Sequence, residues 1–145
     1  MDHDQITAEE FKKRLAQLCL SGRSNELPRK QRDRQIILKS IALYLAPFLA
    51  KEQSCSEREI NAALSRWVGD VGHSLEPDYA ALRRTLVDEK YLERTEGGAA
   101  YRLSSSAGAG LFAAGVDLIN PALVIDEAIL EAAAKREKYR NRPPA

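Results

Sequence analysis

The stretch from Cys55 to Leu103 constrains the fold most, because two short helical patterns and a hairpin pattern follow one another with short connections. Ser56 and Glu59 have capping-box spacing, in which each side chain bonds the other residue's backbone amide. The apolar residues of the first helix then recur at helical spacing, at Ile60, Leu64, Trp67 and Val68. We expect Gly69 to end this helix, because glycine adopts the left-handed backbone without steric cost.

A second helix is predicted to begin at Pro77, because proline is tolerated at the first helical position. Its apolar face comprises Tyr79, Leu82, Leu86 and Val87. Arg83 and Arg84 follow Leu82 by roughly 100° and 200° around the helix axis, so both are expected to point outward. Arginine can bind guanine edges through paired hydrogen bonds or bind phosphates. The alternative is a solvated face on which Arg84 pairs with Asp88 one turn later.

The hairpin pattern consists of Tyr91–Arg94 and Ala100–Leu103, joined by a glycine-containing turn at residues 96–99. Within its second strand Arg102 alternates with apolar neighbours, so one face can be buried while Arg102 faces outward. Residues 53–55 are expected to supply a short strand that pairs with this hairpin. Two helices followed by a hairpin with outward basic residues is the order of a winged helix-turn-helix.

Helical patterns also flank this stretch on both sides. Thr7 and Glu10 have capping-box spacing and precede an apolar face of Phe11, Leu15, Leu18 and Cys19, in a helix ending near Gly22. A long helix follows Leu27-Pro28, with its apolar stripe at Ile37, Leu38, Ile41, Leu45 and Phe48. The predicted fold is mainly α (α+β), a winged helix-turn-helix with added N-terminal and C-terminal helices.

A final helix is predicted from Pro121 to about Arg140, because Asn120 can cap it and proline suits its first position. Its apolar side comprises Leu123, Ile125, Ile129, Leu130 and Ala133, and Glu131 and Lys135 have the spacing of a helical ion pair. This arm either covers its own core or pairs with a second copy, and we favour a homodimer through the terminal helices. The expected divisions are residues 1–26 (helix and linker), 27–104 (winged-helix domain) and 105–145 (linker and helical arm).

Basic residues gather in the first turns of the long helix, at Arg29, Lys30, Arg32 and Arg34. The helix dipole opposes cations there, so either a phosphate backbone or ion pairs with Asp33 and acids on neighbouring elements should offset it. The net charge is only +1, from 22 basic and 21 acidic residues. Non-specific affinity for nucleic acid should therefore be modest.

Enzymatic chemistry has little support in this sequence. No glycine-rich phosphate loop is followed by Gly-Lys-Ser/Thr, and neither histidine lies in a convincing catalytic or metal-binding context. Cys19 and Cys55 are far apart and do not suggest a disulfide framework; Cys55 could be a redox-sensitive thiol at a helix start, but simple burial is the favoured interpretation. We expect no enzyme activity, metal or cofactor, no membrane association, and a cytoplasmic location.

The segments LPRKQRDRQIILKSIA, CSEREIN and DYAALRRTLVDEKYLERTEGGAAYRL resemble a bacterial domain family of unassigned function, from about Leu27 to Leu103. That family occurs alone or fused to helix-turn-helix regulators of the metalloregulator type. Matching positions are Arg83, Arg84, Leu86, Val87, Asp88, Leu92, Arg94, Gly98 and Tyr101. The resemblance implies a winged-helix, regulatory protein. Lys90 departs from the pattern, since glycine is expected before the first wing strand.

These patterns together predict a DNA-binding transcriptional regulator whose partners are double-stranded DNA and a second copy of the chain. Arg83 and Arg84 would enter the major groove with Tyr79 beside them. Arg94 and Arg102 would bind phosphates from the hairpin, and Arg29 and Lys30 would hold the flanking backbone. The alternative is a winged-helix module that contacts proteins and does not bind DNA, which the near-neutral charge and the acids Glu76 and Asp78 favour.

Overall fold

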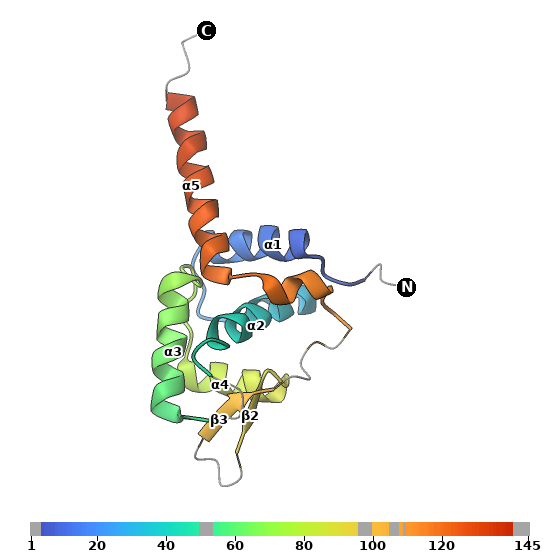
Figure 1. Ribbon diagram of the computed structural model, residues 1–145. Helices are drawn as coiled ribbons and strands as arrows, with labels where there is room; N and C mark the ends of the chain where they lie inside the picture. Colours follow the sequence, from blue (N-terminus) through green and yellow to red (C-terminus); the bar gives the residue numbers. More distant parts are fainter. Residues whose placement is uncertain (1–3, 50–53, 96–99, 105–107, 109, 141–145) are drawn as a thin grey trace.

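The computed structural model describes residues 4–49, 54–95, 100–104, 108 and 110–140. They form a mainly helical body with a small antiparallel sheet and one projecting helix (Figure 1), which confirms the predicted mainly α (α+β) class. The helices are α1 (Ala8–Leu20), α2 (Gln31–Leu45), α3 (Glu57–Asp70), α4 (Tyr79–Asp88) and α5 (Pro121–Arg140), with a short 3-10 helix, η2 (Ala114–Leu118). Within these ranges no helix is both long and apolar enough to span a membrane.

The start of α3 has the predicted capping box. The Ser56 hydroxyl accepts from the Glu59 amide at 3.1 Å, and the Ser56 amide donates to the Glu59 carboxylate at 3.1 Å. The helix continues through Gly69 to Asp70, and Gly69 does not have a positive φ. The prediction that Gly69 ends the helix in a left-handed conformation is therefore wrong, because the chain needs no reversal at that position.

The boundaries of α4 also differ from the prediction. Asp78 caps the helix by accepting from the amides of Ala80 and Ala81 at 2.9 and 3.3 Å, so Pro77 lies before the cap and not at the first helical position. The short polar side chain of aspartate is a better cap than a proline start, because it satisfies amides that have no partner within the helix.

Lys90 ends α4 in the left-handed conformation that glycine usually supplies. Its φ is 70°, the one positive φ among the non-glycine residues that the structure describes. The Tyr91 amide donates to the Leu86 carbonyl at 2.8 Å and the Lys90 amide to the Val87 carbonyl at 3.1 Å, the two bonds of a Schellman motif. The position that departs from the family pattern therefore keeps the backbone geometry expected of glycine.

The sheet has the strand order β1-β3-β2, in which all neighbours are antiparallel. Its strands are β1 (Cys55–Ser56), β2 (Leu92–Arg94) and β3 (Ala100–Leu103). The predicted hairpin and the short strand that pairs with it are thus confirmed, although β1 is Cys55–Ser56 and not residues 53–55, of which Gln53 lies outside the described residues. The predicted turn at 96–99 lies outside the described residues. Tyr101 is buried and Arg102 is exposed, as the alternation predicts.

The core centres on α2, whose residues Ile36, Ile37, Leu38, Ile41 and Leu45 are fully buried. Trp67 of α3 is also fully buried, and its indole Nε1 donates to the Ser40 hydroxyl at 3.2 Å. Phe48, predicted as part of the α2 stripe, lies beyond the end of the helix and is 48% exposed. The helix ends at Leu45, so Phe48 no longer follows the helical period.

The segment before α1 pairs with the segment before η2, and α1 packs against α2, η2 and α5 (Figure 1). Ile6 forms a parallel bridge with Phe112, with its amide 2.8 Å from the Leu111 carbonyl and its carbonyl 2.9 Å from the Ala113 amide. The ring of Phe112 then meets that of Phe11 on α1 edge to face, with centroids 6.2 Å apart. The N-terminal helix and the segment leading to α5 therefore share one core.

The bounds of α5 agree with the prediction, and the Asn120 side chain caps it by accepting from the Ala122 amide at 3.1 Å. The burial of its side chains differs from the prediction. Only Pro121, Val124 and Ile125 are buried, whereas Leu123, Leu130 and Ala133 of the predicted apolar side are exposed. Glu131 and Lys135 do not form an ion pair with each other. The helix extends past the body after its first two turns, so its remaining apolar residues have nothing to cover.

Candidate nucleic-acid interface

A hollow of about 410 Å³ lies between α4 and the hairpin. It is lined by Glu57, Ala80, Arg83, Arg84, Val87, Asp88, Arg94 and Tyr101. Three of the seven predicted site residues therefore come together here, two from α4 and one from β2. Because the lining holds three arginines and only two acids, it favours an anionic group over a cationic one.

Arg83 is the least accessible of these arginines. Its side chain is 11% exposed, and its guanidinium contacts the Glu57 carboxylate at 2.8 Å and the Asn61 side-chain oxygen, both on α3. Its Nε atom is buried and has no hydrogen-bond partner among the described atoms. The guanidinium therefore links α4 to α3, and the outward orientation predicted from its helical angle is wrong.

Arg84 differs from its neighbour in both exposure and pairing. It is exposed, and its guanidinium forms no ion pair with any residue that the structure describes. The predicted alternative, a pair with Asp88 one turn later, is not formed. Since an unpaired exposed guanidinium keeps all its donors available, Arg84 is the α4 side chain best able to bind an external anion or base edge.

The hairpin contributes two arginines, Arg94 on the edge strand β2 and Arg102 on the central strand β3. The Arg94 guanidinium lies 5.8 Å from the centroid of the Tyr101 ring. Arg102 lies opposite Glu93 in the β2–β3 register, and its Nε is 2.8 Å from the Glu93 carboxylate. Both partners of this pair are about half exposed, so it contributes little to stability and could open for another anion. Tyr79 is half-buried against the core and lies outside the hollow.

Arg29 and Lys30 are exposed and lie just before α2, not in its first turns as predicted. Arg29 lines a second groove of about 370 Å³, on the other side of α4 from the hollow. This groove is lined by residues 24–29 of one loop, Leu75, Pro77 and Asp78 of another, Ala81, Leu82 and Thr85 of α4, and Arg34 and Trp67. The loops meet because the Ser24 amide bonds the Ser74 carbonyl and the Glu76 amide bonds the Ser24 carbonyl, both at 2.9 Å.

Sequence reasoning missed this second groove. Its walls come from two loops about fifty residues apart, and no local pattern links them. The only signal in the sequence is that neither loop has a regular apolar pattern. This predicts that the loops are exposed, but not that they bond to each other.

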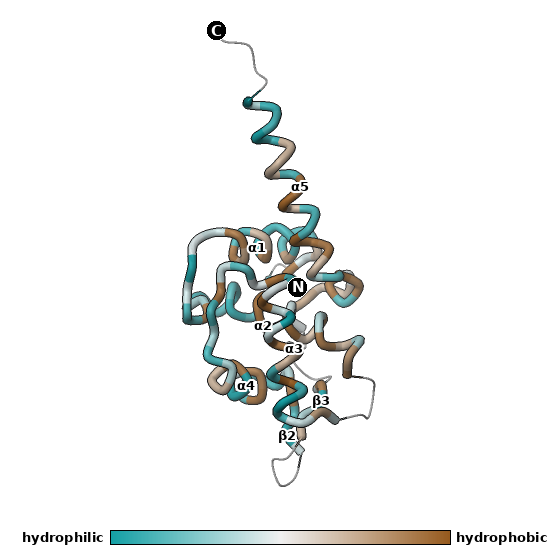
Figure 2. The backbone as a smooth tube through the Cα atoms, turned by 90° about the vertical axis from the view of Figure 1, so that its left-hand side faces the viewer, coloured by the Kyte–Doolittle hydropathy of each residue, from teal (hydrophilic) through white to brown (hydrophobic). Residues whose placement is uncertain are grey.

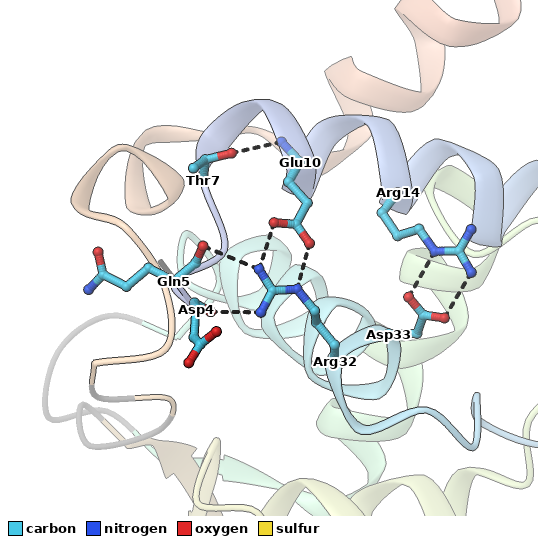
Figure 3. A network of polar contacts seen from close by, with 7 residues as sticks. All are labelled: Asp4, Gln5, Thr7, Glu10, Arg14, Arg32 and Asp33. Carbon is cyan, nitrogen blue, oxygen red and sulfur yellow. Dashed lines mark hydrogen bonds and ion pairs between the residues drawn. The ribbon is translucent and has the colours of Figure 1, made fainter. Parts of the chain in front are cut away.

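Arg32 and Arg34 of α2 form ion pairs with acidic residues of neighbouring elements. Figure 3 shows the contacts of Arg32. The Arg32 guanidinium binds both carboxylate oxygens of Glu10, at 2.6 and 2.7 Å, and the Asp4 carbonyl at 2.6 Å. This hydrogen bonding holds the pKa of Glu10 below its usual value. Glu10 is therefore not free to complete the predicted capping box, of which only the Thr7 half forms.

A second bidentate pair joins Arg14 of α1 to Asp33 of α2, with both contacts at 2.8 Å (Figure 3). Hydrogen bonding to Arg14 lowers the pKa of Asp33 below its usual value. Arg34 reaches Glu89 at 3.8 Å. Of the two explanations for basic residues at the start of α2, ion pairing accounts for Arg32 and Arg34, and only Arg29 and Lys30 are left for a phosphate.

Neither cysteine has the surroundings of an activated thiol. Burial raises the pKa of Cys19 to about 12. The pKa of Cys55 is also raised, first by burial and then by the nearby Glu59 carboxylate. These causes outweigh any stabilisation of a thiolate by the start of α3 and favour the structural interpretation of Cys55. Among the described residues no group of three histidine, cysteine or acidic side chains is arranged to hold a metal ion.

Residues 23–103, more than half of the chain, match a family described as "Uncharacterized protein conserved in bacteria (DUF2087)". The chain belongs to the DUF2087 family. No curated protein and no solved structure matches it. The resemblance to a bacterial family of unassigned function is thereby confirmed, whereas the fusion to metalloregulator-type regulators stays a prediction. The DUF2087 segment includes α2 to β3 and the whole hollow, and it excludes α1, η2 and α5.

Proposed function

We propose that this DUF2087 protein is a winged-helix DNA-binding protein that regulates transcription, with α4 as its recognition helix. The order α2, β1, α3, α4, β2, β3 and the strand order β1-β3-β2 support this proposal. The observation that carries it is the hollow in which Arg84 of α4, exposed and unpaired with any described residue, lies beside Arg94 of the hairpin. Such a helix presents side chains to base edges while the hairpin lies along the sugar-phosphate backbone.

The roles of the predicted residues divide according to their surroundings. Arg84 is the base-reading residue, because an arginine fork binds guanine O6 and N7 together. Arg83 is a positioning residue that holds α4 on α3 through Glu57. Arg94 and Arg102 bind phosphate from the hairpin. Opening the exposed Arg102–Glu93 pair costs about 0–1 kcal/mol, which a phosphate contact readily offsets.

The remaining predicted residues flank α4. Arg29 lines the groove along one side of this helix, so Arg29 and Lys30 can hold the backbone next to the recognition site. Tyr79 begins α4 and contributes packing that fixes the angle of the helix.

Binding of a random duplex, followed by fluorescence anisotropy over a salt series from about 50 to 200 mM, tests this proposal. We expect salt-dependent binding that weakens when Arg84 and Arg94 are both replaced by alanine, because the phosphate contact of Arg94 does not depend on sequence. The matched control is Lys13→Ala on α1, which removes an exposed cation far from the hollow in sequence and should change affinity little. Absence of binding at low salt, or equal losses for the double variant and Lys13→Ala, would refute the proposal.

A protein-contact module is the second candidate, and the second groove favours it. Leu27, Pro28, Leu75, Pro77 and Leu82 give that groove a largely apolar lining, while Glu76 and Asp78 at the start of α4 repel phosphate. A protein that fails to bind any duplex at low salt, although it is folded, would be assigned to this class.

A further inference from the structure

Helix α5 leaves the body of the protein after its first two turns. Val124 and Ile125 are buried against the body, whereas from Asp126 to Arg140 every residue is exposed except the half-buried Ala128. Both views show the helix extending well past all other elements (Figures 1 and 2). Its alanine, glutamate and lysine content favours the helical state. The projecting part is therefore a formed helix that lacks a packing partner within the described chain.

The exposed part carries an apolar stripe directed away from the body. Leu123 and Leu130 are 53% and 69% exposed and lie one heptad apart, with Ala134 one further turn along. Val124 and Ile125 lie roughly 100° and 200° around the axis from Leu123, so the stripe and the buried side occupy different faces. Leucine in water at two successive heptad positions is typical of a helix that pairs with another helix.

Charge on α5 is divided along its length. The acidic residues Asp126, Glu127 and Glu131 precede the basic residues Lys135, Arg136, Lys138 and Arg140. Glu137 is the exception, and it lies 3.9 Å from Arg140 of its own helix. A second α5 in the opposite direction would bring acidic residues against basic ones at both ends, whereas a parallel copy would bring like charges together.

We propose that α5 pairs with α5 of a second copy of this chain, antiparallel and crossing near Leu130, to form a homodimer. Leu130 of one helix meets Leu130 of the other at the crossing, and the opposed charge halves set the direction of pairing. The helix dipoles also oppose each other favourably in this arrangement. This pairing does not depend on DNA binding, because it uses none of the residues of the hollow.

Sedimentation equilibrium without DNA, at a series of protein concentrations in the micromolar range, measures this association. We expect the unchanged chain to be dimeric at the upper end and Leu130→Glu to be monomeric throughout. Leu118→Glu is the matched control, since Leu118 lies in η2, is 89% exposed and should not affect dimerisation. Far-UV circular dichroism shows whether each variant keeps its helix content. A monomeric unchanged chain, or a folded Leu130→Glu variant that still dimerises, overturns the proposal.

Charge reversal tests the direction of pairing. The triple variant Lys135→Glu, Arg136→Glu and Lys138→Glu makes both halves acidic, so we expect a monomer. Adding Asp126→Lys, Glu127→Lys and Glu131→Lys gives a sextuple variant whose first half is basic and whose second half is acidic. The halves then attract each other again in an antiparallel pair, so the dimer should be restored. A sextuple variant that stays monomeric while helical would exclude the antiparallel arrangement. Because no nucleic acid is present, failure here leaves the proposed DNA binding unaffected.

Discussion

The guanidinium of Arg83 on α4 lies 2.8 Å from the carboxylate of Glu57 on α3, and the Arg83 side chain is only 11% exposed. The adjacent residue, Arg84, is exposed and lacks an ion pair with any described residue. Two neighbouring arginines thus have different physical tasks. One stabilises the angle between two helices, and the other is available to a ligand.

Replacing each arginine by alanine should separate these tasks in a stability measurement. Arg83→Ala removes two charge-assisted contacts and a largely buried aliphatic stem, so we expect it to lower the free energy of unfolding by about 1–3 kcal/mol. Arg84→Ala should change it by less than about 0.5 kcal/mol, as is usual for exposed positions. Urea unfolding followed by circular dichroism gives both values. Equal costs for the two variants would contradict the assignment of Arg83 to the α3–α4 contact.

Lys90→Gly should stabilise the protein. A residue with a side chain at φ 70° bears a steric cost that glycine avoids. Glycine also has greater freedom in the unfolded chain, which offsets part of this gain. We expect a net increase of about 0.5–1 kcal/mol in the free energy of unfolding. Asp88→Gly, within the last turn of α4, is the control and should destabilise. A lower midpoint of thermal unfolding for Lys90→Gly would show that the left-handed geometry carries no strain.

Stability should fall below about pH 4.5, because the hydrogen bonds from Arg14 and Arg32 lower the pKa values of Asp33 and Glu10 in the folded state. For groups with a lowered folded pKa, the stabilisation is complete above the unfolded pKa and is lost as pH falls through the folded pKa. Urea unfolding from pH 7 to about pH 3 measures this loss. Asp33→Asn should flatten the dependence, and Asp126→Asn on exposed α5 should leave it as it is.

The two thiols should react at very different rates with a thiol-specific disulfide reagent. Cys19 is fully buried and its pKa is raised to about 12, so it should react only when the protein unfolds. The partly exposed Cys55 should react in the native state, more slowly than a free thiol because its pKa is also raised. Cys55→Ser should abolish the native reaction. Fast reaction of both thiols would contradict the packing of α1.

Local signals predicted the helices and strands well. The Ser56–Glu59 capping box and the Asn120 cap need only residues three apart, and both form as expected. The helix ends near Gly69 and Phe48 were predicted wrongly. A helix ends where tertiary contacts cease to favour it, and the sequence does not show that position directly. The periodicity of α5 predicted its helix but could not show that Leu123 and Leu130 would extend beyond the body.

The candidate site was only partly predictable. Helical angles identified α4 as the element with outward arginines, and the hollow does bring Arg83, Arg84 and Arg94 together. The angles could not show that Arg83 would form an ion pair with Glu57 of α3. Nor could they show the ion pairs of Arg32 with Glu10 and of Arg34 with Glu89. Ion pairs between elements depend on how α1, α3 and α4 pack around α2, which is a property of the whole chain.

The bridge between Ile6 and Phe112 has a consequence for the synthesis of the protein. Ile6 and Phe11 are synthesised more than a hundred residues before Phe112, the partner that covers them. At about 5–20 residues per second, these side chains wait roughly 5 to 20 s for that partner. The nascent α1 segment therefore exposes apolar surface until Phe112 has been synthesised, and a ribosome that stalls before Leu111 leaves this part of the core uncovered.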